Sequence, residues 1–421
     1  MLTHVDHREA REPSLRFLSS LRGAPGSRYL LEAGSELILV DGGLFKGDAS
    51  PPIKNETYFP FSVHELKAVI LIHSNLESFR YLPQLFRDGF RGDVVCSSAT
   101  RDLCEIAFSR SVMDEFLHPR EAQKILSHFR GMDWDREFSI GSEFKIRLHY
   151  AGHILGAAHV AIDVREKTVV FSGDLGRLAD PLLLAPTSIE RADYLILEPA
   201  RDSRLNPVIE PEDELLQAVE PVLVNEGVVL LTASDGVRAR LVLSLLTAIH
   251  SRRYLSKVPI YFDCSDFSDL RQIFERYAND IKLTREQLNL ALADSTQILS
   301  KQVLLDLQSK KGPMVILTTD LLPSLEPFKT WIAQPKNLIL FTDFQSAGTV
   351  GAALLSGQPA VKIDGIYWPV RAASKQILSL NTYADGAEIL DWLKGCRIHP
   401  SKVFLTYGEI FSSRSLRDRI Q

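Results

Sequence analysis

The residues best suited to chemistry lie directly after an apolar run, AVILI, at residues 68–72. Such a run predicts a buried strand. The chain continues with HSNLES, which contains His73, Asn75, Glu77 and Ser78. Imidazole nitrogen and carboxylate oxygen bind transition metals well, whereas the amide of Asn75 and the hydroxyl of Ser78 are poor donors to zinc.

Three further motifs place single polar residues beside predicted strands. LILVDGGLFKG puts Asp41 at a strand end, where a carboxylate can orient neighbouring ligands. AGHILGAAHV puts His153 in a glycine-flanked loop, where the backbone can approach an ion closely. VVFSGDLGR puts Asp174 just after a strand, where it could bridge two metals. As alternatives, the histidines would be hydrogen-bonded interior groups and the aspartates turn or cap residues, while His159 would only pack.

Length and composition indicate a large protein with packed cores. A chain of 421 residues exceeds one hydrophobic core, so we expect two domains. With 45% hydrophobic and 24% charged residues, the composition excludes a disordered chain. No apolar run approaches the roughly 20 residues that span a bilayer, and the N-terminus lacks the apolar segment of a signal peptide. We therefore expect a cytoplasmic protein with no membrane partner.

Cysteine spacing and net charge narrow the function further. The four cysteines show no C-x-x-C spacing, which favours reduced thiols over a disulfide framework or a zinc cluster. A net charge of -5 argues against broad attraction to nucleic acid, but a local basic groove is compatible with it. A basic cluster could form such a groove, although a solvated helix face is the simpler interpretation. Its members are Arg238, Arg240, Arg252, Arg253 and Lys257.

Short apolar runs alternate with helical patterns, which predicts an α/β architecture. Strands are predicted at residues 36–41, 68–72, 93–96, 144–150, 168–172 and 194–198, and then at 227–232, 259–263, 314–318 and 337–342. Helices predicted at 213–225, 236–250 and 266–277 separate the second set, which is the spacing of βαβ units in a parallel sheet. A final unit has a helix at 385–395, a strand at 402–406 and a helix at 413–420.

The order, spacing and context of these motifs resemble the β-CASP family of the metallo-β-lactamase superfamily, a group of RNA and DNA nucleases. The resemblance runs from about Ser14 to the C-terminus, and EPARDSRLNP places Glu198 at the acidic position of the family's motif A. It implies an αββα sandwich, built from residues 1–206 and 359–421, with an α/β β-CASP domain inserted at 207–358.

The resemblance also implies two metal sites, and most of their ligands are replaced. The first-metal frame is a weak site for one zinc or manganese ion and contains His73, Asn75, His153 and Asp174. The second-metal frame has lost both imidazoles and contains Glu77, Ser78, Asp174 and Tyr407. Tyr383 occupies the frame of a general-acid histidine, and a phenol with a pKa of about 10 holds its proton at neutral pH. We expect both tyrosines to fill the cavity of the metals.

The phosphate-binding segments implied by the resemblance are altered as well. At the first helix of the insertion the chain reads TASDGVR, which keeps Arg238 but places Asp235 near the helix N-terminus, where it would compete with an anion or cap the helix. A later segment contains Gln345, Gly348 and Thr349. These three residues and Arg238 are the nucleic-acid-binding residues that the resemblance implies, and the alternative for Arg238 is an exposed helix residue.

These observations predict a degenerate, catalytically impaired β-CASP homologue. It would bind RNA or single-stranded DNA, or regulate an active β-CASP nuclease paralogue. The alternative is a metal-dependent RNA or DNA hydrolase with an altered, mononuclear site, in which Glu77 would act as the base. A third alternative is an interaction protein that binds neither metal nor nucleic acid.

Overall fold

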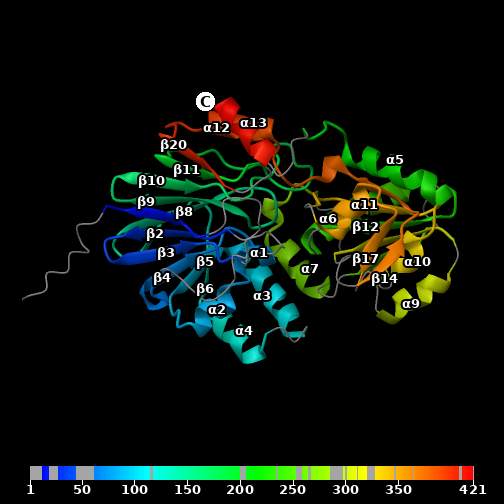
Figure 1. Cartoon of the computed structure of the whole chain (residues 1–421), viewed down its shortest axis with the longest axis horizontal. Helices are drawn as coiled ribbons and strands as arrows, with labels where there is room; N and C mark the ends of the chain where they lie inside the picture. Colours follow the sequence, from blue (N-terminus) through cyan, green and yellow to red (C-terminus); the bar gives the residue numbers. More distant parts are fainter. Residues whose placement is uncertain are drawn as a thin grey trace, which may run out of the picture. The chain divides into compact units, whose positions relative to one another are not determined.

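A computed structural model of the chain describes residues 12–18, 27–43, 61–113, 117–199, 205–233, 236–252, 258–263, 267–284, 297–298, 301–310, 312–319, 328–345, 348–363, 365–406 and 410–420. The chain divides into two compact units (Figure 1). Unit 1 combines Met1–Leu205 with Tyr383–Gln421, and unit 2 is Asn206–Thr382. None of the described helices combines the length and apolarity that crossing a membrane requires.

The first sheet of unit 1 has the order β1-β2-β3-β4-β5-β6. Its strands are β1 (Ser14–Phe17), β2 (Tyr29–Ala33), β3 (Glu36–Val40), β4 (Leu66–Ile70), β5 (Asp93–Ser97) and β6 (Phe129–Met132). Strands β1 to β3 are antiparallel, and β3 to β6 are parallel. The helical segments that follow or separate these strands are η2 (Val63–Glu65), α1 (Leu76–Phe79), α2 (Leu82–Arg87), α3 (Ser98–Met113) and α4 (Pro119–Leu126).

The second sheet of unit 1 has the order β20-β11-β10-β9-β8-β7. Its strands are β7 (Phe138–Ile140), β8 (Phe144–Tyr150), β9 (Ala158–Val164), β10 (Lys167–Phe171), β11 (Tyr194–Leu197) and β20 (Lys402–Leu405). Strands β7 to β10 form an antiparallel meander, whereas β10, β11 and β20 are parallel. The C-terminal part of the chain also contributes α12 (Gly386–Lys394) and α13 (Ile410–Ile420).

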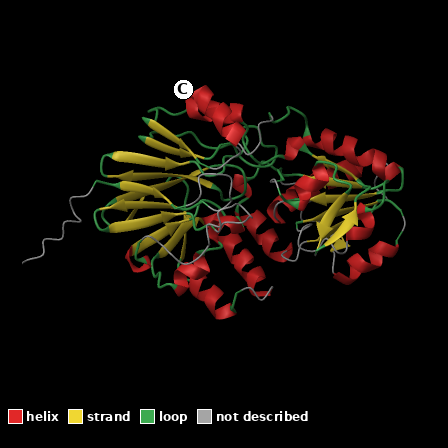
Figure 2. Ribbon diagram, in the orientation of Figure 1, coloured by secondary structure: helices red, strands yellow, loops and turns green. Residues whose placement is uncertain are grey.

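Alternating side chains of the strands build three apolar layers in unit 1. Leu31, Ile38 and Ile70 face the layer between the two sheets, which also receives Ile146 and Val160 from the second sheet. Side chains of opposite parity on the same strands pack against α2, α3 and α4 in a second layer. A third layer joins β10 and β11 to α12 and α13. Unit 1 is therefore an αββα sandwich, with helices outside both sheets (Figure 2).

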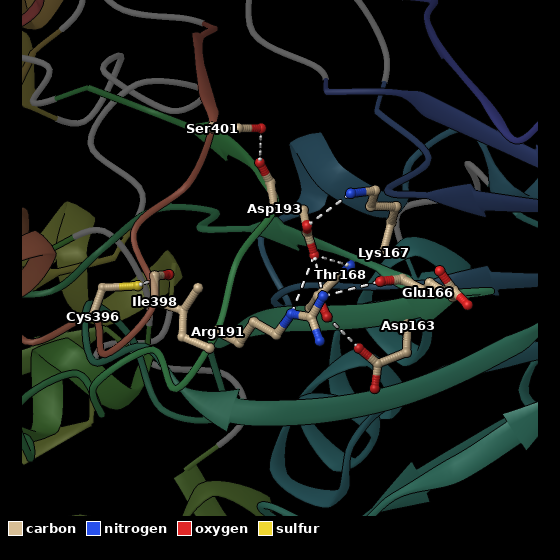
Figure 3. Close-up of polar contacts among 9 residues, drawn as sticks. All are labelled: Asp163, Glu166, Lys167, Thr168, Arg191, Asp193, Cys396, Ile398 and Ser401. Carbon is tan, nitrogen blue, oxygen red and sulfur yellow. Dashed lines mark hydrogen bonds and ion pairs between the residues drawn. The ribbon is translucent and has the colours of Figure 1, made fainter.

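A polar network fixes the returning C-terminal segment to the rest of unit 1 (Figure 3). The carboxylate of Asp193 accepts hydrogen bonds from the backbone of Thr168 at 2.9 Å and from Arg191 at 3.0 Å, and it pairs with Lys167 at 3.3 Å. The carbonyl of Asp193 accepts from the backbone and the hydroxyl of Ser401, at 2.9 and 2.8 Å. These contacts set the register in which β20 adds to β11.

Unit 2 contains a six-stranded parallel sheet with the order β14-β13-β15-β12-β16-β19. Its strands are β12 (Val228–Thr232), β13 (Ile260–Asp263), β14 (Gln297–Ile298), β15 (Met314–Thr318), β16 (Leu338–Phe341) and β19 (Ala373–Gln376). A separate antiparallel hairpin is formed by β17 (Ala360–Ile363) and β18 (Ile366–Pro369). The helical segments are α5 (Pro211–Val224), α6 (Gly236–Arg252), α7 (Phe267–Arg276), η4 (Ala278–Asp280), α9 (Lys301–Ser309), α10 (Lys329–Ile332), α11 (Val350–Leu355) and η6 (Leu378–Leu380).

The expected fold class is confirmed, and the extent of the insertion differs from the expected one. The insertion was expected to end at Gln358, whereas unit 2 continues to Thr382. The reason is β19, which adds to β16 at the edge of the unit 2 sheet. Cys96, Cys104 and Cys396 are buried free thiols, and Cys264 lies outside the described residues.

Candidate functional site

Three of the expected ligand residues meet at strand ends in unit 1. His73 follows β4, His153 lies in the loop between β8 and β9, and Asp174 follows β10. All three are buried. The Nε2 atoms of His73 and His153 lie 3.5 and 3.7 Å from the same Asp174 oxygen, Oδ2. The two rings are 6.1 Å apart between centroids. The structure thus gathers two imidazoles around one carboxylate.

The backbone of the His153 loop is held in an unusual conformation. His153 has a φ of 59° and the preceding Gly152 a φ of 71°, in the left-handed region that most side chains avoid. The loop is pressed against Gly176, where an added Cβ would lie 2.0 Å from the backbone nitrogen of His153. Strain of this kind persists only where the surroundings enforce it, and it concentrates at functional sites.

Asp41 lies close to His73. Its φ is 57°, and its Oδ1 atom accepts a hydrogen bond of 3.0 Å from the backbone nitrogen of Ile72. Burial raises the pKa of Asp41 to about 6, although the neighbouring His73 and the Ile72 hydrogen bond act in the opposite direction. Asp41 therefore fixes the strand end that carries His73.

The second nitrogen of His73 contacts a residue of the second-metal frame. The His73 Nδ1 atom and the Ser78 Oγ atom form a hydrogen bond of 3.2 Å. Burial opposes protonation of this ring and lowers its pKa. Asp174 acts in the opposite direction, through a hydrogen bond and through its negative charge, and so do the charges of Asp41 and Glu198. The pKa of His73 is therefore raised above its usual value. Ser78 thus orients His73, and its backbone nitrogen donates to the carbonyl of Asn75 at 2.8 Å.

Tyr383 packs against the His153 ring of the cluster. Its ring lies 4.2 Å from the His153 ring between centroids, at an interplanar angle of 34°. A β-bridge joins Tyr383 to Gly176, and the next residue, Ala384, donates to the carbonyl of Leu175 at 2.8 Å. The first residue of the C-terminal segment is therefore built into the site.

Glu198, the motif A residue, is bound by hydroxyl groups that the sequence did not indicate. Its Oε1 atom accepts hydrogen bonds from the Ser27 hydroxyl at 2.9 Å and the Tyr29 hydroxyl at 3.4 Å. The Tyr29 hydroxyl also contacts the Thr406 hydroxyl at 2.9 Å. Because 171 residues separate Ser27 from Glu198, no local motif could have predicted this contact.

The described donors do not fit the two-metal centre that the resemblance implies. Within the described ranges, no three His, Cys, Asp or Glu side chains are arranged so that they could hold a metal ion. In the second-metal frame, the Ser78 hydroxyl is engaged by His73. Tyr407 lies outside the described residues, as does the side chain of Glu77.

The expected nucleic-acid-binding residues lie in unit 2, and their described contacts are internal. Arg238 is 2% exposed, and its Nη2 atom donates to the carbonyl of Leu380. Gln345 Nε2 donates to the Asp343 carbonyl at 3.2 Å, Gly348 has a φ of 83°, and the Thr349 hydroxyl caps α11 by accepting from the backbone nitrogen of Ala352 at 3.2 Å. These contacts hold the residues within unit 2.

The basic cluster of α6 was interpreted as a solvated helix face, and that interpretation is wrong for the two members whose side chains are described. Arg238 and Arg240 are 2% and 0% exposed. Helix α6 is apolar on several sides, so neighbouring elements cover its first turns. The arginine side chains in these turns are buried as a result. The side chains of Arg252, Arg253 and Lys257 lie outside the described part of the chain.

Two sheets enclosed by helices, with histidine and aspartate residues at the strand ends and a parallel-sheet domain inserted, define a metallo-β-lactamase fold of the β-CASP type. Residues 239–354 match the family model of the Beta-Casp domain. Ribonuclease TTHA0252 of Thermus thermophilus is 30% identical over 402 residues, which cover 92% of this chain and 91% of that protein. This chain therefore belongs to the β-CASP nuclease family of the metallo-β-lactamase superfamily.

Two further similarities extend over most of the chain. Transcription termination factor FttA of Lokiarchaeum sp. is 26% identical over 434 residues, which cover 93% of this chain and 66% of that protein. A crystal structure of a protein of unknown function from Enterococcus faecalis V583 superposes with a TM-score of 0.55 and 13% identity, over 94% of each chain. The latter similarity supports the fold alone.

Proposed function

We propose that this chain is a catalytically impaired β-CASP homologue that binds RNA and regulates an active nuclease of the same family. The observation that carries the proposal is the contact between Ser78 and His73. A position in the second-metal frame holds a hydroxyl, and that hydroxyl is hydrogen-bonded to the ring of the first-metal frame.

Physical chemistry supports the loss of the usual reaction. Two-metal hydrolysis of a phosphodiester needs one ion to generate hydroxide and both ions to neutralise the negative charge that develops. Asn75 and Ser78 are weak donors to such ions, and Tyr383, in the frame of the general acid, packs against His153 at an interplanar angle of 34°. A phenol holds its proton too tightly at neutral pH to replace an imidazole as the acid.

RNA is the proposed ligand because of the relatives. One relative is named a ribonuclease and covers the chain almost completely, and another is named a transcription termination factor. A chain that keeps the family's two-unit architecture and lacks several of its metal ligands retains the scaffold for binding, and we infer that it lacks the chemistry. A protein that binds RNA without cleaving it can still regulate an active paralogue, because regulation requires binding and no catalysis.

Cleavage of labelled single-stranded RNA tests the impairment. Wild-type protein and Asp174→Ala, prepared identically, are compared with added zinc or manganese. We expect equal, background-level traces from both. Cleavage by the wild type that Asp174→Ala abolishes would overturn the proposal and establish the alternative, a hydrolase with a mononuclear site. That alternative draws on the approach of two imidazoles to one Asp174 oxygen.

Binding and partnership need separate measurements. Fluorescence anisotropy with matched single-stranded RNA and DNA oligonucleotides should show saturable binding, with RNA preferred. Mixing the chain with an active β-CASP nuclease should give a complex on size-exclusion chromatography and a changed cleavage rate. The absence of a complex together with an unchanged rate would remove the regulatory role and leave RNA binding alone.

A further inference from the structure

The hairpin of unit 2 presents an aromatic ring and a cation side by side on its outer face. Tyr367 in β18 is 71% exposed. Its cross-strand partner in β17 is Lys362, which is also exposed. Directly opposed residues of an antiparallel pair have Cβ atoms about 4.5–5.5 Å apart, so the ring and the ammonium group share one surface.

The inner face of the same hairpin is anchored in the core. Val361 and Ile363 are buried in the unit 2 cluster, and Trp368 packs against it. The Nζ atom of Lys329, in α10, lies 4.4 Å from the centroid of the Trp368 ring. Because the strands alternate, this anchoring holds Tyr367 outward on a rigid support. A ring that faces outward in this way is accessible for stacking by a planar group.

Three basic residues lie in the hairpin and in the segment that follows it, through β19. Lys362, Arg371 and Lys375 are exposed, and none makes an ion pair or side-chain hydrogen bond with the part of the chain that the structure describes. Asp364, the one acidic residue between 358 and 376, lies outside the described residues.

The charged face of the second sheet in unit 1 differs in this respect. A cavity of about 590 Å³ lies there, lined by basic and acidic residues in equal number. Its cations are already paired: Arg147 with Asp163 at 2.9 Å, and Arg191 with Asp193 at 3.0 Å. An anion entering this cavity would have to break those pairs, whereas Lys362 in the hairpin, and Arg371 and Lys375 after it, have no such pair with the described part of the chain.

We propose that the outer face of the β17–β18 hairpin binds single-stranded RNA. A base stacks on Tyr367, and Lys362, Arg371 and Lys375 contact the phosphates that flank it. Aromatic stacking beside a basic track is the general mode of single-strand binding without sequence preference, because every base offers a π-face. This inference rests on the proposed RNA-binding function and gives that function a location outside the histidine cluster.

Anisotropy titrations of a fluorescein-labelled oligouridylate with the full-length chain test the inference. Tyr367→Ala should weaken binding about 5- to 160-fold, the range of one base–aromatic stack, while Tyr367→Phe stays within about twofold of wild type. Ile366→Ala is the matched control, because Ile366 is 59% exposed on the same strand. All of these side chains are exposed, so far-UV circular dichroism and thermal unfolding should be unchanged.

The cations are tested by the salt dependence. A combined Lys362→Gln, Arg371→Gln and Lys375→Gln variant should lower the slope of log K against log salt by about 2, since each phosphate contact of a single strand contributes about 0.7. Lys310→Gln, an exposed lysine elsewhere in unit 2, should leave the slope unchanged.

The outcomes separate this inference from the proposed function. Wild-type protein that binds no RNA would overturn the proposed function. Wild-type binding that Tyr367→Ala and the triple variant leave intact would overturn the hairpin site while the proposed function stands. A loss of affinity in Tyr367→Ala with an unchanged salt slope in the triple variant would also overturn the site as proposed, because the three cations would then make no contact with the phosphates.

Discussion

Ser78 shows how a single side chain changes the role of its neighbour. A hydroxyl at this position fixes the His73 ring through Nδ1 and leaves Nε2 directed at Asp174. A hydrogen bond to one imidazole nitrogen determines what the other nitrogen can do. His73 is therefore held between Ser78 on one side and Asp174 on the other.

His159 is a buried imidazole whose titration affects stability. Its Nε2 atom lies 3.0 Å from the Thr187 carbonyl, and its ring stacks on His149 at 4.9 Å between centroids. Burial, with the nearby His149, lowers the pKa of His159 to about 3. As the pH falls below about 6.5, His159 becomes protonated in the unfolded chain but stays neutral in the folded chain. The stability that the neutral, buried His159 contributes is therefore fully present above pH 6.5 and is lost as the pH falls toward 3.

The His159→Gln variant should remove this acid sensitivity. Urea unfolding at pH 7, 6, 5 and 4 should show wild-type stability falling faster than that of the variant, by at most about 1.4 kcal/mol per pH unit below pH 6. His399→Gln, in an exposed position, serves as the control and should follow the wild-type curve. Parallel curves for wild type and His159→Gln would contradict the assignment.

Gly176 should tolerate no side chain. A Cβ there would meet the His153 nitrogen at 2.0 Å and the Gly152 carbonyl carbon at 2.7 Å, both of them backbone atoms. Gly176→Ala should therefore lower the free energy of unfolding by about 1–3 kcal/mol, as overpacking does. The readout is the urea midpoint. Gly386→Ala, where the nearest atom is a flexible Arg419 nitrogen at 3.5 Å, should not be destabilised.

Among the elements, α12 owes its start to a capping box. Asp385 accepts from the backbone nitrogens of Ala387 and Glu388 at 2.8 and 2.9 Å, and Glu388 accepts in return from the Asp385 nitrogen at 3.0 Å. Glu388 also accepts from the Leu178 nitrogen at 3.0 Å, which ties the helix to the segment after Asp174. The same capping residues thus begin the helix and hold the segment that follows Asp174.

Removal of this cap should destabilise unit 1. Asp385→Ala should cost about 1 kcal/mol, with a range of roughly 0.5–2 kcal/mol for lost N-caps. Chemical denaturation followed by tryptophan fluorescence would measure it, since Trp392, one of the four tryptophans, lies on the same helix. Asp391→Ala removes only an exposed pair with Lys394 and should change stability by less than about 0.5 kcal/mol. Equal effects of the two substitutions would refute the capping argument.

The elements that the sequence predicted are those with a strong apolar signal. The buried strands β4, β8 and β15 follow directly from their composition. β19 has the sequence ASKQ, which carries no apolar alternation, so only its pairing with β16 defines it. This is the physical reason why unit 2 extends beyond the end of the insertion that the sequence predicts.

The residues of the candidate site likewise fall into those that local motifs predict and those that only distant contacts bring together. Residues next to strand ends, such as His73 and Asp174, were found from local motifs. The hydroxyls of Ser27 and Tyr29 were not, because their contact with Glu198 exists only once distant strands are paired. The exposure of Tyr367 likewise depends on which face of its hairpin the core covers.

At the scale of the whole molecule, unit 1 is completed only by the last part of the chain. Trp392, Ile389 and Leu416 fill the layer over β10 and β11, and the Trp392 indole donates to the Thr187 carbonyl at 2.7 Å. A chain that ends after Thr382 would lack β20, α12 and α13. It would leave the apolar face of β10 and β11 uncovered.

Two truncations should give graded results. The chain ending at Thr382 should lose the cooperative unfolding transition of unit 1 and aggregate, whereas a chain ending at Thr406 keeps β20 and Trp392 and should remain folded with a lower midpoint. Differential scanning calorimetry and light scattering would measure both. A normal transition for unit 1 in the shorter chain would show that the C-terminal segment is dispensable.

The late arrival of β20 has a consequence for protein synthesis. β11 pairs with β10 on one side, and its other edge pairs with residues 402–405 only after these have been synthesised. As the chain leaves the ribosome, more than two hundred residues are made between these two strands. During that interval β11 is an open edge with apolar side chains, the kind of surface that joins nascent chains to one another. Unit 2, by contrast, is continuous in sequence and can be complete before then, so slow translation or chaperone scarcity should harm unit 1 first.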